Sequence, residues 1–195
     1  MAAFDHYITF ENGCKVLIKH EPASIPILRK FFKDFDPSLI VELGTSVGGL
    51  TMLMEESCNA DIYTYDNKDS VYDHMKKFGY LDKFKRTTFV KQNVLRQPYF
   101  PLMELLKKDS RKILYCDNGN KAMEVNMYCR CLNLGDVVGV HDFGLPLICL
   151  EHMVCALAGF EELPINKEFE EAKCGSRFWM RKNWILGLKK VVYEK

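Results

Sequence analysis

The sequence lacks the features that mark several classes of protein. It has no uncharged run approaching about 18 residues, so we expect no membrane-spanning segment. The N-terminus, Met-Ala-Ala-Phe-Asp-His, has neither the basic nor the apolar part of a signal peptide. There is no internal repeat, low-complexity run or linker. We therefore expect one domain over residues 1–195, with an N-terminal flank at 1–37 and a core at 38–195.

Paired cysteines are also missing. None of the eight cysteines forms a CxxC motif, and Cys129 and Cys131 are separated by one residue only. Several cysteines lie inside apolar runs, where cysteine behaves as a small hydrophobic residue. Without paired Cys/His ligand spacing, a structural zinc site is not expected. Free thiols in a reducing, cytoplasmic setting fit this pattern best.

An excess of charge of one sign is the third absence. Lysine and arginine number 27 and aspartate and glutamate 26, which gives a formal charge of +1. This balance excludes a global electrostatic footprint for nucleic acid or an anionic membrane. A small basic cluster, Lys83, Lys85 and Arg86, is interpreted as a solvated surface. The expected partner is a small-molecule substrate, and the sequence leaves a homodimer open.

What the sequence does contain is an alternation of strand-like and helix-like segments. Short apolar runs predict buried strands, and apolar residues at helical spacing predict helices. An Asn12–Gly13 hairpin precedes a helix capped by Ser24. The predicted strands are 7–10, 15–18, 39–41, 61–66, 87–91, 112–116, 137–140, 160–165 and 177–181, with a further edge segment at 187–193. Predicted helices include 50–56, 68–78, one starting at Pro98, one ending near Leu132, and 146–158.

This alternation predicts a single Rossmann-like α/β fold, a doubly wound and mostly parallel sheet with an N-terminal hairpin and helix as a flank. Right-handed crossovers place the carboxyl ends of the parallel strands at one edge, where such sheets bind ligands. Polar residues stand at these predicted ends: Glu42, Asp66, Asn93, Asp117, His141 and Asp142.

The most informative stretch is the turn after the first core strand, Val41-Glu42-Leu43-Gly44-Thr45-Ser46-Val47-Gly48-Gly49. A strand, a glycine turn and a helix bring backbone N–H groups up to a nucleotide-like ligand. Ser46 occupies the middle-glycine position of the dinucleotide fingerprint, which weakens a pyrophosphate interpretation. Gly49-Leu50-Thr51 lacks the lysine of a phosphate-binding Walker loop.

This turn, with an acid two residues before its first glycine, resembles motif I of class I methyltransferases that use S-adenosylmethionine (SAM). The order Gly13-Cys14-Lys15-Val16, His20-Glu21-Pro22, then the turn, resembles the cephalosporin hydroxylase/rhamnosyl O-methyltransferase group. The stretch 135–142 is similar to small-molecule O-methyltransferases generally. The resemblance implies that SAM is bound at the turn and strand ends by Glu42, Gly44, Thr45, Ser46, Gly48, Gly49, Asp66, Asn93 and Asp117, with Asp66 accepting from the ribose hydroxyls.

By resemblance to catechol-type O-methyltransferases, Asp117, His141 and Asp142 become candidate ligands of Mg²⁺ or Mn²⁺. The imidazole of His141 replaces an acid of those enzymes and makes Mn²⁺ more plausible. Asp117 and Lys121 are the candidate catalytic residues, with Lys121 as the base. Lys121 follows Asp117 by four residues rather than three, so a solvated surface lysine is the competing interpretation.

The resulting hypothesis is metal-assisted O-methylation of a small hydroxylated molecule such as a sugar or phenol. Two alternatives stay open at this point. One is a binding protein that keeps the methyltransferase fold but has lost catalysis. The other is a methyltransferase acting on RNA or another macromolecule, which would need a basic rim around the cleft.

Overall fold

The structure, a computed structural model, describes residues 6–11, 13–68, 70–144 and 148–183, so the predicted edge segment at 187–193 lies outside it. Its strands are β1 His6–Thr9, β2 Lys15–Ile18, β3 Leu39–Leu43, β4 Asp61–Asp66, β5 Thr87–Lys91, β6 Lys112–Cys116, β7 Val137–Val140, β8 Phe160–Glu162 and β9 Arg177–Arg181. Its α-helices are α1 Ser24–Phe35, α2 Gly49–Ser57, α3 Ser70–Lys77, α4 Phe100–Lys107, α5 Lys121–Tyr128 and α6 Asn166–Glu171, with 3₁₀ turns η1 Leu81–Lys83, η2 Cys129–Cys131 and η3 Leu150–His152.

The predicted mostly parallel sheet is confirmed. Within the described residues, seven strands follow the order β5-β4-β3-β6-β7-β9-β8, and only the pairings of β9 with β7 and β8 in this sheet are antiparallel. The chain runs outward from β3 to β5 and then returns to β6 on the other side of β3. The switch in strand order therefore lies between β3 and β6, and ligands of doubly wound sheets bind at such a point. Leu43 pairs with both Tyr65 and Cys116, so Asp66 and Asp117 emerge beside the β3–α2 loop.

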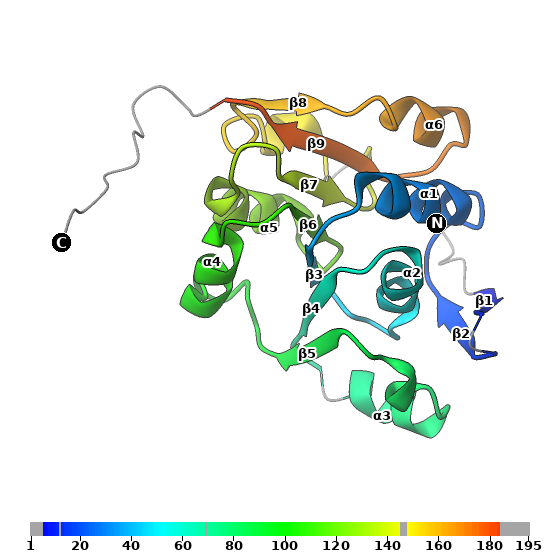
Figure 1. Cartoon of the computed structure of the whole chain (residues 1–195). Coiled ribbons are helices and arrows are strands. Elements are labelled where there is room, and N and C mark those ends of the chain that lie inside the picture. Colours follow the sequence, from blue (N-terminus) through cyan, green and yellow to red (C-terminus); the bar gives the residue numbers. More distant parts are fainter. Residues whose placement is uncertain (1–5, 12, 69, 145–147, 184–195) are drawn as a thin grey trace.

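Helices cover both faces of the sheet. Figure 1 shows α1 and α2 on one side and α4 and α5 on the other. Alternate residues of each strand point to opposite faces, so Ile40 packs in the core under α1 and α2 and Val41 in the core under α4 and α5. Burial on both faces explains why the central strands are continuous apolar runs. None of the described helices is long and apolar enough to cross a membrane.

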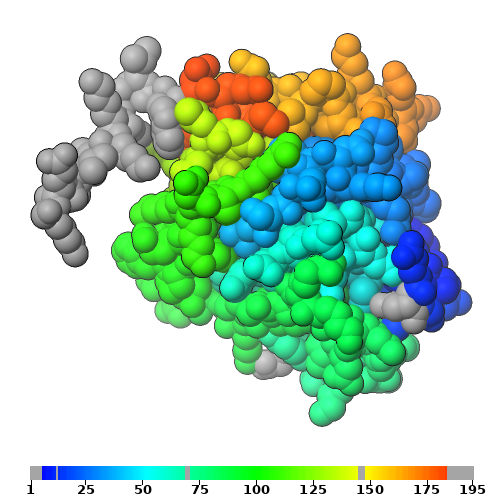
Figure 2. All heavy atoms as spheres, in the orientation of Figure 1, coloured from blue at the N-terminus to red at the C-terminus, as the bar shows by residue number. Residues whose placement is uncertain are grey.

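The N-terminal hairpin forms a separate antiparallel pair of strands, as predicted. Tyr7 pairs with Leu17, and Gly13 has a φ of 79° in the turn. Strand β2 of the hairpin packs against α2. In Figure 2 the dark blue spheres of the N-terminal segment lie at the margin of the molecule. The N-cap of the following helix, α1, was predicted at Ser24 but is Ala23. The hydroxyl of Ser24 instead donates a hydrogen bond to the carbonyl of Glu21.

Two predictions in the C-terminal part are wrong. The helix expected at 146–158 is replaced, in its described part, by η3 and further turns, in which Met153 and Ala156 donate to carbonyls three residues earlier. Met153, Ala156 and Leu157 are buried at helical spacing, so consecutive turns satisfy the same apolar pattern. The strand expected at 160–165 ends at Glu162, and α6 follows although no helix was predicted there.

Candidate functional site

Two adjoining cavities open at the carboxyl edge of the sheet. The larger has a volume of about 700 Å³ and extends toward the N-terminal segment and β9. The smaller has a volume of about 480 Å³ and extends toward β4 and α3. Both are lined by Lys19, Gly44, Ser46, Val47 and Asp117. The β3–α2 loop and the first residue after β6 therefore form the border between the cavities.

The glycines of the β3–α2 loop are needed by contacts inside the protein. Gly44 has a φ of 109°, and a Cβ there would lie 2.6 Å from the carbonyl oxygen of Asp117. Gly48 also has a positive φ, and a Cβ at Gly49 would collide with the carbonyl oxygen of Leu17 in β2. The absent side chains thus let the loop after β6 and the hairpin approach the turn closely.

Ser46 takes the left-handed conformation with a φ of 50°, although it is not glycine. Its backbone N–H donates to Asp66 Oδ2 at 3.0 Å, and the N–H of Lys68 donates to Asp66 Oδ1 at 3.0 Å. Each carboxylate oxygen has a second acceptor site. Asp66 can therefore accept two further hydrogen bonds from a ligand in the smaller cavity, which it lines.

Glu42 lies behind the loop and lines neither cavity. It is completely buried, and its Oε2 accepts hydrogen bonds from the hydroxyls of Thr51 and Thr64. Its Oε1 has no hydrogen-bond partner among the described residues. Burial raises the pKa of Glu42 to about 8, although the two hydroxyls act against it. The position predicted for direct cofactor contact is thus a buried polar support for the turn.

Asn93 lies apart from the cavities. Its side-chain oxygen accepts from the backbone N–H groups of Leu95 and Arg96, which is a local turn. The residue lines neither cavity. The structure therefore does not bring Asn93 together with the other predicted cofactor-binding residues.

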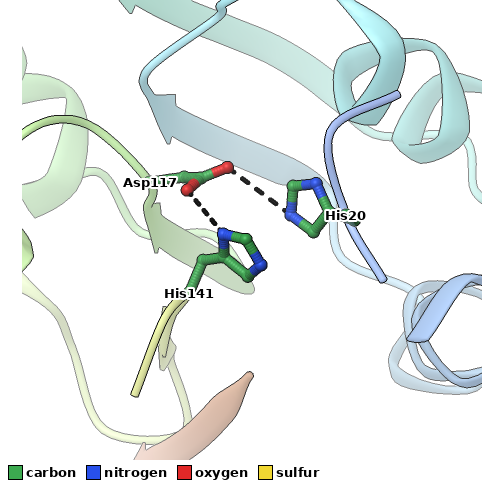
Figure 3. A group of neighbouring side chains, drawn as sticks. All are labelled: His20, Asp117 and His141. Atoms are coloured by element: carbon green, nitrogen blue, oxygen red, sulfur yellow. Dashed lines mark hydrogen bonds and ion pairs between the residues drawn. The ribbon is translucent and has the colours of Figure 1, made fainter. Parts of the chain in front are cut away.

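Asp117, at the border between the two cavities, is the centre of a polar cluster. Its Oδ1 lies 2.9 Å from His141 Nδ1, and its Oδ2 lies 3.5 Å from His20 Nε2. Burial alone would raise the pKa of Asp117, but the charges of His141 and His20 outweigh it and lower the pKa. Figure 3 shows the carboxylate of Asp117 facing both imidazoles, with His20 reaching it from the N-terminal segment.

Lys121 points into this cluster rather than into solvent. Its Nζ donates to Asp142 Oδ2 at 2.8 Å and lies 3.8 Å from Asp117 Oδ1, and the side chain is only 11% exposed. The interpretation as a solvated surface lysine is therefore wrong. Burial would lower the pKa of Lys121, but Asp117 and Asp142 raise it overall. Lys121 is protonated in this arrangement.

His141 lies between two carboxylates. Its Nδ1 faces Asp117, and its Nε2 lies 3.3 Å from Glu21 Oε2. Burial would lower the pKa of His141, but Asp117 and Glu21 raise it to about 10. The other oxygen of Glu21 accepts from the backbone N–H of Gly175 at 3.2 Å, so Glu21 is itself held in place.

His20 stacks on His141 with ring centroids 4.0 Å apart. Burial and the charge of His141 lower the pKa of His20 to about 4, so its ring is neutral at physiological pH. Sequence reasoning did not single out His20 or Glu21 as site residues. The available signal was their place directly after the hairpin, in the stretch that carries the resemblance to O-methyltransferases.

Most of the predicted residues meet at the two cavities. Residues that line at least one cavity are Gly44, Thr45, Ser46, Gly49, Asp66, Asp117, Lys121, His141 and Asp142. Glu42 supports the loop from behind, Gly48 belongs to the loop and leaves room for Met75, and Asn93 lies apart from both cavities. Asp142 has a φ of 58°, and a Cβ on Gly175 would lie 3.2 Å from its Cα, so the segment just before β9 approaches this turn closely.

Comparisons with known proteins address the fold. No protein-family model matches the sequence, and no curated protein matches it either. Solved structures do match. One is a Staphylococcus aureus protein assigned as a caffeoyl-CoA O-methyltransferase, with a TM-score of 0.60, 12% identity and 86% of each chain covered.

Two further solved structures have a similar fold. The apo structure of CmcI-N160 has a TM-score of 0.59 at 14% identity, covering 91% of this chain and 77% of that chain. Human N-acetylserotonin methyltransferase in complex with SAM has a TM-score of 0.53 at 13% identity, covering 83% of this chain and 52% of that chain. The chain therefore has the Rossmann-like fold of class I SAM-dependent methyltransferases.

Proposed function

We propose that the protein is a SAM-dependent methyltransferase that transfers a methyl group to the oxygen of a small hydroxylated substrate, such as a sugar or phenol. The observation that carries this proposal is the pair of cavities that share the β3–α2 loop and Asp117. A methyl donor in one cavity and an acceptor in the other would meet at this border. Bringing two reactants together in this way is a large part of catalysis.

The smaller cavity suits the donor. Asp66 has acceptor capacity for two hydroxyls, and the exposed turn at Ser46 leaves the loop backbone open to a ligand. When bound, SAM supplies an electrophilic methyl group on a sulfonium. The carboxylates of Asp66 and Asp117 line this cavity and would lie near the positively charged sulfonium of SAM. Lys19 lines both cavities.

The larger cavity suits the methyl acceptor. Its oxygen and nitrogen ligand atoms also fit a divalent metal ion. Asp117 and His141 would hold the ion, because an oxygen and a nitrogen ligand atom already face each other at 2.9 Å. An imidazole ligand favours Mn²⁺ over Mg²⁺. A metal ion there would lower the pKa of a substrate hydroxyl. Asp142, the third predicted ligand, has one oxygen bonded to Lys121.

The predicted base, Lys121, must lose a proton before it can accept one. Asp117 and Asp142 raise its pKa, which opposes this role in the arrangement described. A protonated Lys121, which lines the smaller cavity and lies 3.8 Å from Asp117 at its border with the larger one, would instead stabilise the developing negative charge on a substrate oxygen. Substitution by methionine should then lower kcat by a larger factor than it weakens the binding of SAM.

No observation favours the RNA alternative. Arg86 donates to the carbonyls of Glu55 and Cys58, and its cluster with Lys83 and Lys85 lines neither cavity. The binding-protein alternative differs from the enzyme in one measurable respect, since it predicts SAM affinity without transfer of the methyl group.

Calorimetric titration with SAM, with and without EDTA, tests the proposal. Asp66→Ala should weaken binding about 10–100-fold, because hydrogen bonds to a charged group contribute about 1.5–3 kcal/mol. Asp61→Ala is the matched control, since Asp61 is exposed at the opposite end of the same strand. Absence of SAM binding at millimolar concentration contradicts the proposal, and equal effects of both variants contradict the role of Asp66.

Transfer itself is tested with SAM labelled in the methyl group and a panel of sugars and phenols. Labelled product that disappears in Lys121→Met and in Asp117→Asn supports an enzyme. SAM binding without transfer to any member of the panel supports the binding-protein alternative.

A further inference from the structure

We propose that His20, Asp117 and His141 together bind one divalent transition-metal ion in preference to Mg²⁺, with His20 as the third protein ligand in place of Asp142. The role of this ion in methyl transfer rests on the proposed function, whereas its binding does not. The inference differs from the sequence-based ligand set because it takes one ligand from the N-terminal segment.

The three side chains converge on one point. Among the described residues, they form a group in which one ligand atom from each lies within 4.8 Å of the others. His141 Nδ1 and His20 Nε2 face the two oxygens of the same carboxylate, at 2.9 and 3.5 Å. Figure 3 shows both rings directed toward Asp117. Two imidazole nitrogens and a carboxylate form a donor set typical of transition metals, whereas Mg²⁺ prefers oxygen ligands only.

His20 is a buried polar ring without a strong hydrogen bond. It is 3% exposed, and its Nδ1 has no hydrogen-bond partner among the described residues. Its Nε2 has Asp117 Oδ2 and the Tyr115 hydroxyl at 3.5 Å each, which is the outer limit of a hydrogen bond. A buried polar side chain in this state needs an explanation. A metal bond would give Nε2 the strong partner that these two contacts do not supply.

The surroundings of His141 match those of a metal-bound histidine. Such a histidine almost always donates its second ring N–H to a carboxylate or carbonyl. His141 Nε2 lies 3.3 Å from Glu21 Oε2, and the backbone N–H of Gly175 holds Glu21 Oε1. With Nε2 directed at Glu21, Nδ1 is the ring nitrogen that faces Asp117 Oδ1, at 2.9 Å, and both atoms can bind the same ion.

Asp142 already has a different partner. Its Oδ2 accepts from Lys121 at 2.8 Å, and its Oδ1 lies 3.6 Å from His141 Nδ1. His20, Asp117, His141 and Asp142 all line the larger cavity. Three protein ligands at the wall of a cavity leave coordination positions for water or a substrate oxygen, as in catalytic rather than structural metal sites.

The test is a titration of the EDTA-treated protein with Co²⁺, followed by visible absorption in a reductant that does not bind metals. We expect one equivalent to bind without a thiolate charge-transfer band, which excludes the free cysteines as ligands. Excess Mg²⁺ should leave the spectrum unchanged. His20→Gln should weaken Co²⁺ binding by at least about 100-fold, and Glu21→Gln by about 10–100-fold.

Asp142→Asn and His152→Gln are the controls, and both should bind Co²⁺ within a few-fold of the wild type. His152 is a histidine on η3, away from both cavities. The proposal is overturned if His20→Gln binds normally, if Asp142→Asn abolishes binding, or if Mg²⁺ displaces Co²⁺ at equal concentration.

A measurement on the wild type covers the case in which His20→Gln fails to fold. Two histidine ligands should give two solvent-exchangeable ring N–H resonances with large paramagnetic shifts in the proton NMR spectrum of the Co²⁺ protein. A single such resonance would overturn the proposal. Titration with SAM in EDTA and the labelled-methyl assay together separate the two inferences. Failure of metal binding leaves SAM affinity intact, whereas failure of the proposed function is seen as absence of SAM binding or of methyl transfer.

Discussion

Substituting Glu42 by glutamine should remove a pH-dependent part of the stability of the protein. Glu42 is fully buried, with Oε2 bonded to Thr51 and Thr64 and Oε1 without a partner among the described residues. Burial, and to a smaller extent the charge of Asp117, raises the pKa of Glu42 from 4.5 to about 8. The folded protein therefore keeps this carboxyl group protonated at neutral pH.

The sign and size of the effect follow from linkage. Because the folded pKa lies above the unfolded one, this contribution to stability is complete below pH 4.5 and is lost as the pH rises to about 8. Each pKa unit corresponds to about 1.4 kcal/mol, so the full loss is about 5 kcal/mol, of which about 3 kcal/mol has occurred by pH 7. A glutamine at position 42 cannot ionise, so the variant should not lose this stability as the pH rises.

Urea unfolding of the wild type and Glu42→Gln between pH 5 and pH 8, under reducing conditions, measures this term. The difference in unfolding free energy between the two proteins should shift by about 3 kcal/mol across this range in favour of glutamine. Other titrating groups cancel in the difference. Glu161→Gln, on the exposed surface of β8, should run parallel to the wild type. Parallel curves for Glu42→Gln as well would refute the reasoning.

Two further predictions concern the free energy of unfolding in urea. Gly44→Ala should lower it by well over 2 kcal/mol, because the added Cβ would meet Asp117. Gly79 also has a positive φ but open space around it, so Gly79→Ala should lower it by about 1–2 kcal/mol, and equal losses would show that the contact with Asp117 is unimportant. Lys112→Met should cost about 3–5 kcal/mol because its buried Nζ is paired with Asp136 at 2.8 Å, and Asp136→Asn in the same chain should recover part of the loss.

The strands of the central sheet could be predicted because each is specified by the residues of its own segment. The strands Asp61–Asp66, Thr87–Lys91, Lys112–Cys116 and Val137–Val140 coincide with the predicted ones. Lys112–Cys116 and Val137–Val140 are short apolar runs buried on both faces, and Asp61–Asp66 and Thr87–Lys91 are short segments rich in β-branched and aromatic residues, so each strand is marked by its own sequence. The region after Asp142 failed because Met153, Ala156 and Leu157 satisfy helical spacing with turns.

The candidate site was predictable where it depends on strand ends. Asp66 ends a parallel strand and Asp117 and His141 each directly follow one, so topology alone brings them to one edge. The orientation of Lys121 was not predictable, because it depends on a pairing with Asp142, 21 residues away. The roles of the glycines were also hidden, since Gly44 and Gly49 are required by contacts with Asp117 and Leu17 rather than by a ligand alone.

His20 and Glu21 show why a flank cannot be separated from a site by sequence alone. Glu21 meets His141 across 120 residues and Gly175 across 154, distances over which no local pattern carries information. The link is made by Gly49. Its missing side chain lets the carbonyl of Leu17 lie against the start of α2, and His20 follows Leu17 by three residues. The glycine turn at the border of the two cavities therefore also packs against the strand that precedes His20, so the segment directly after the N-terminal hairpin, Lys19 to Glu21, is part of the site.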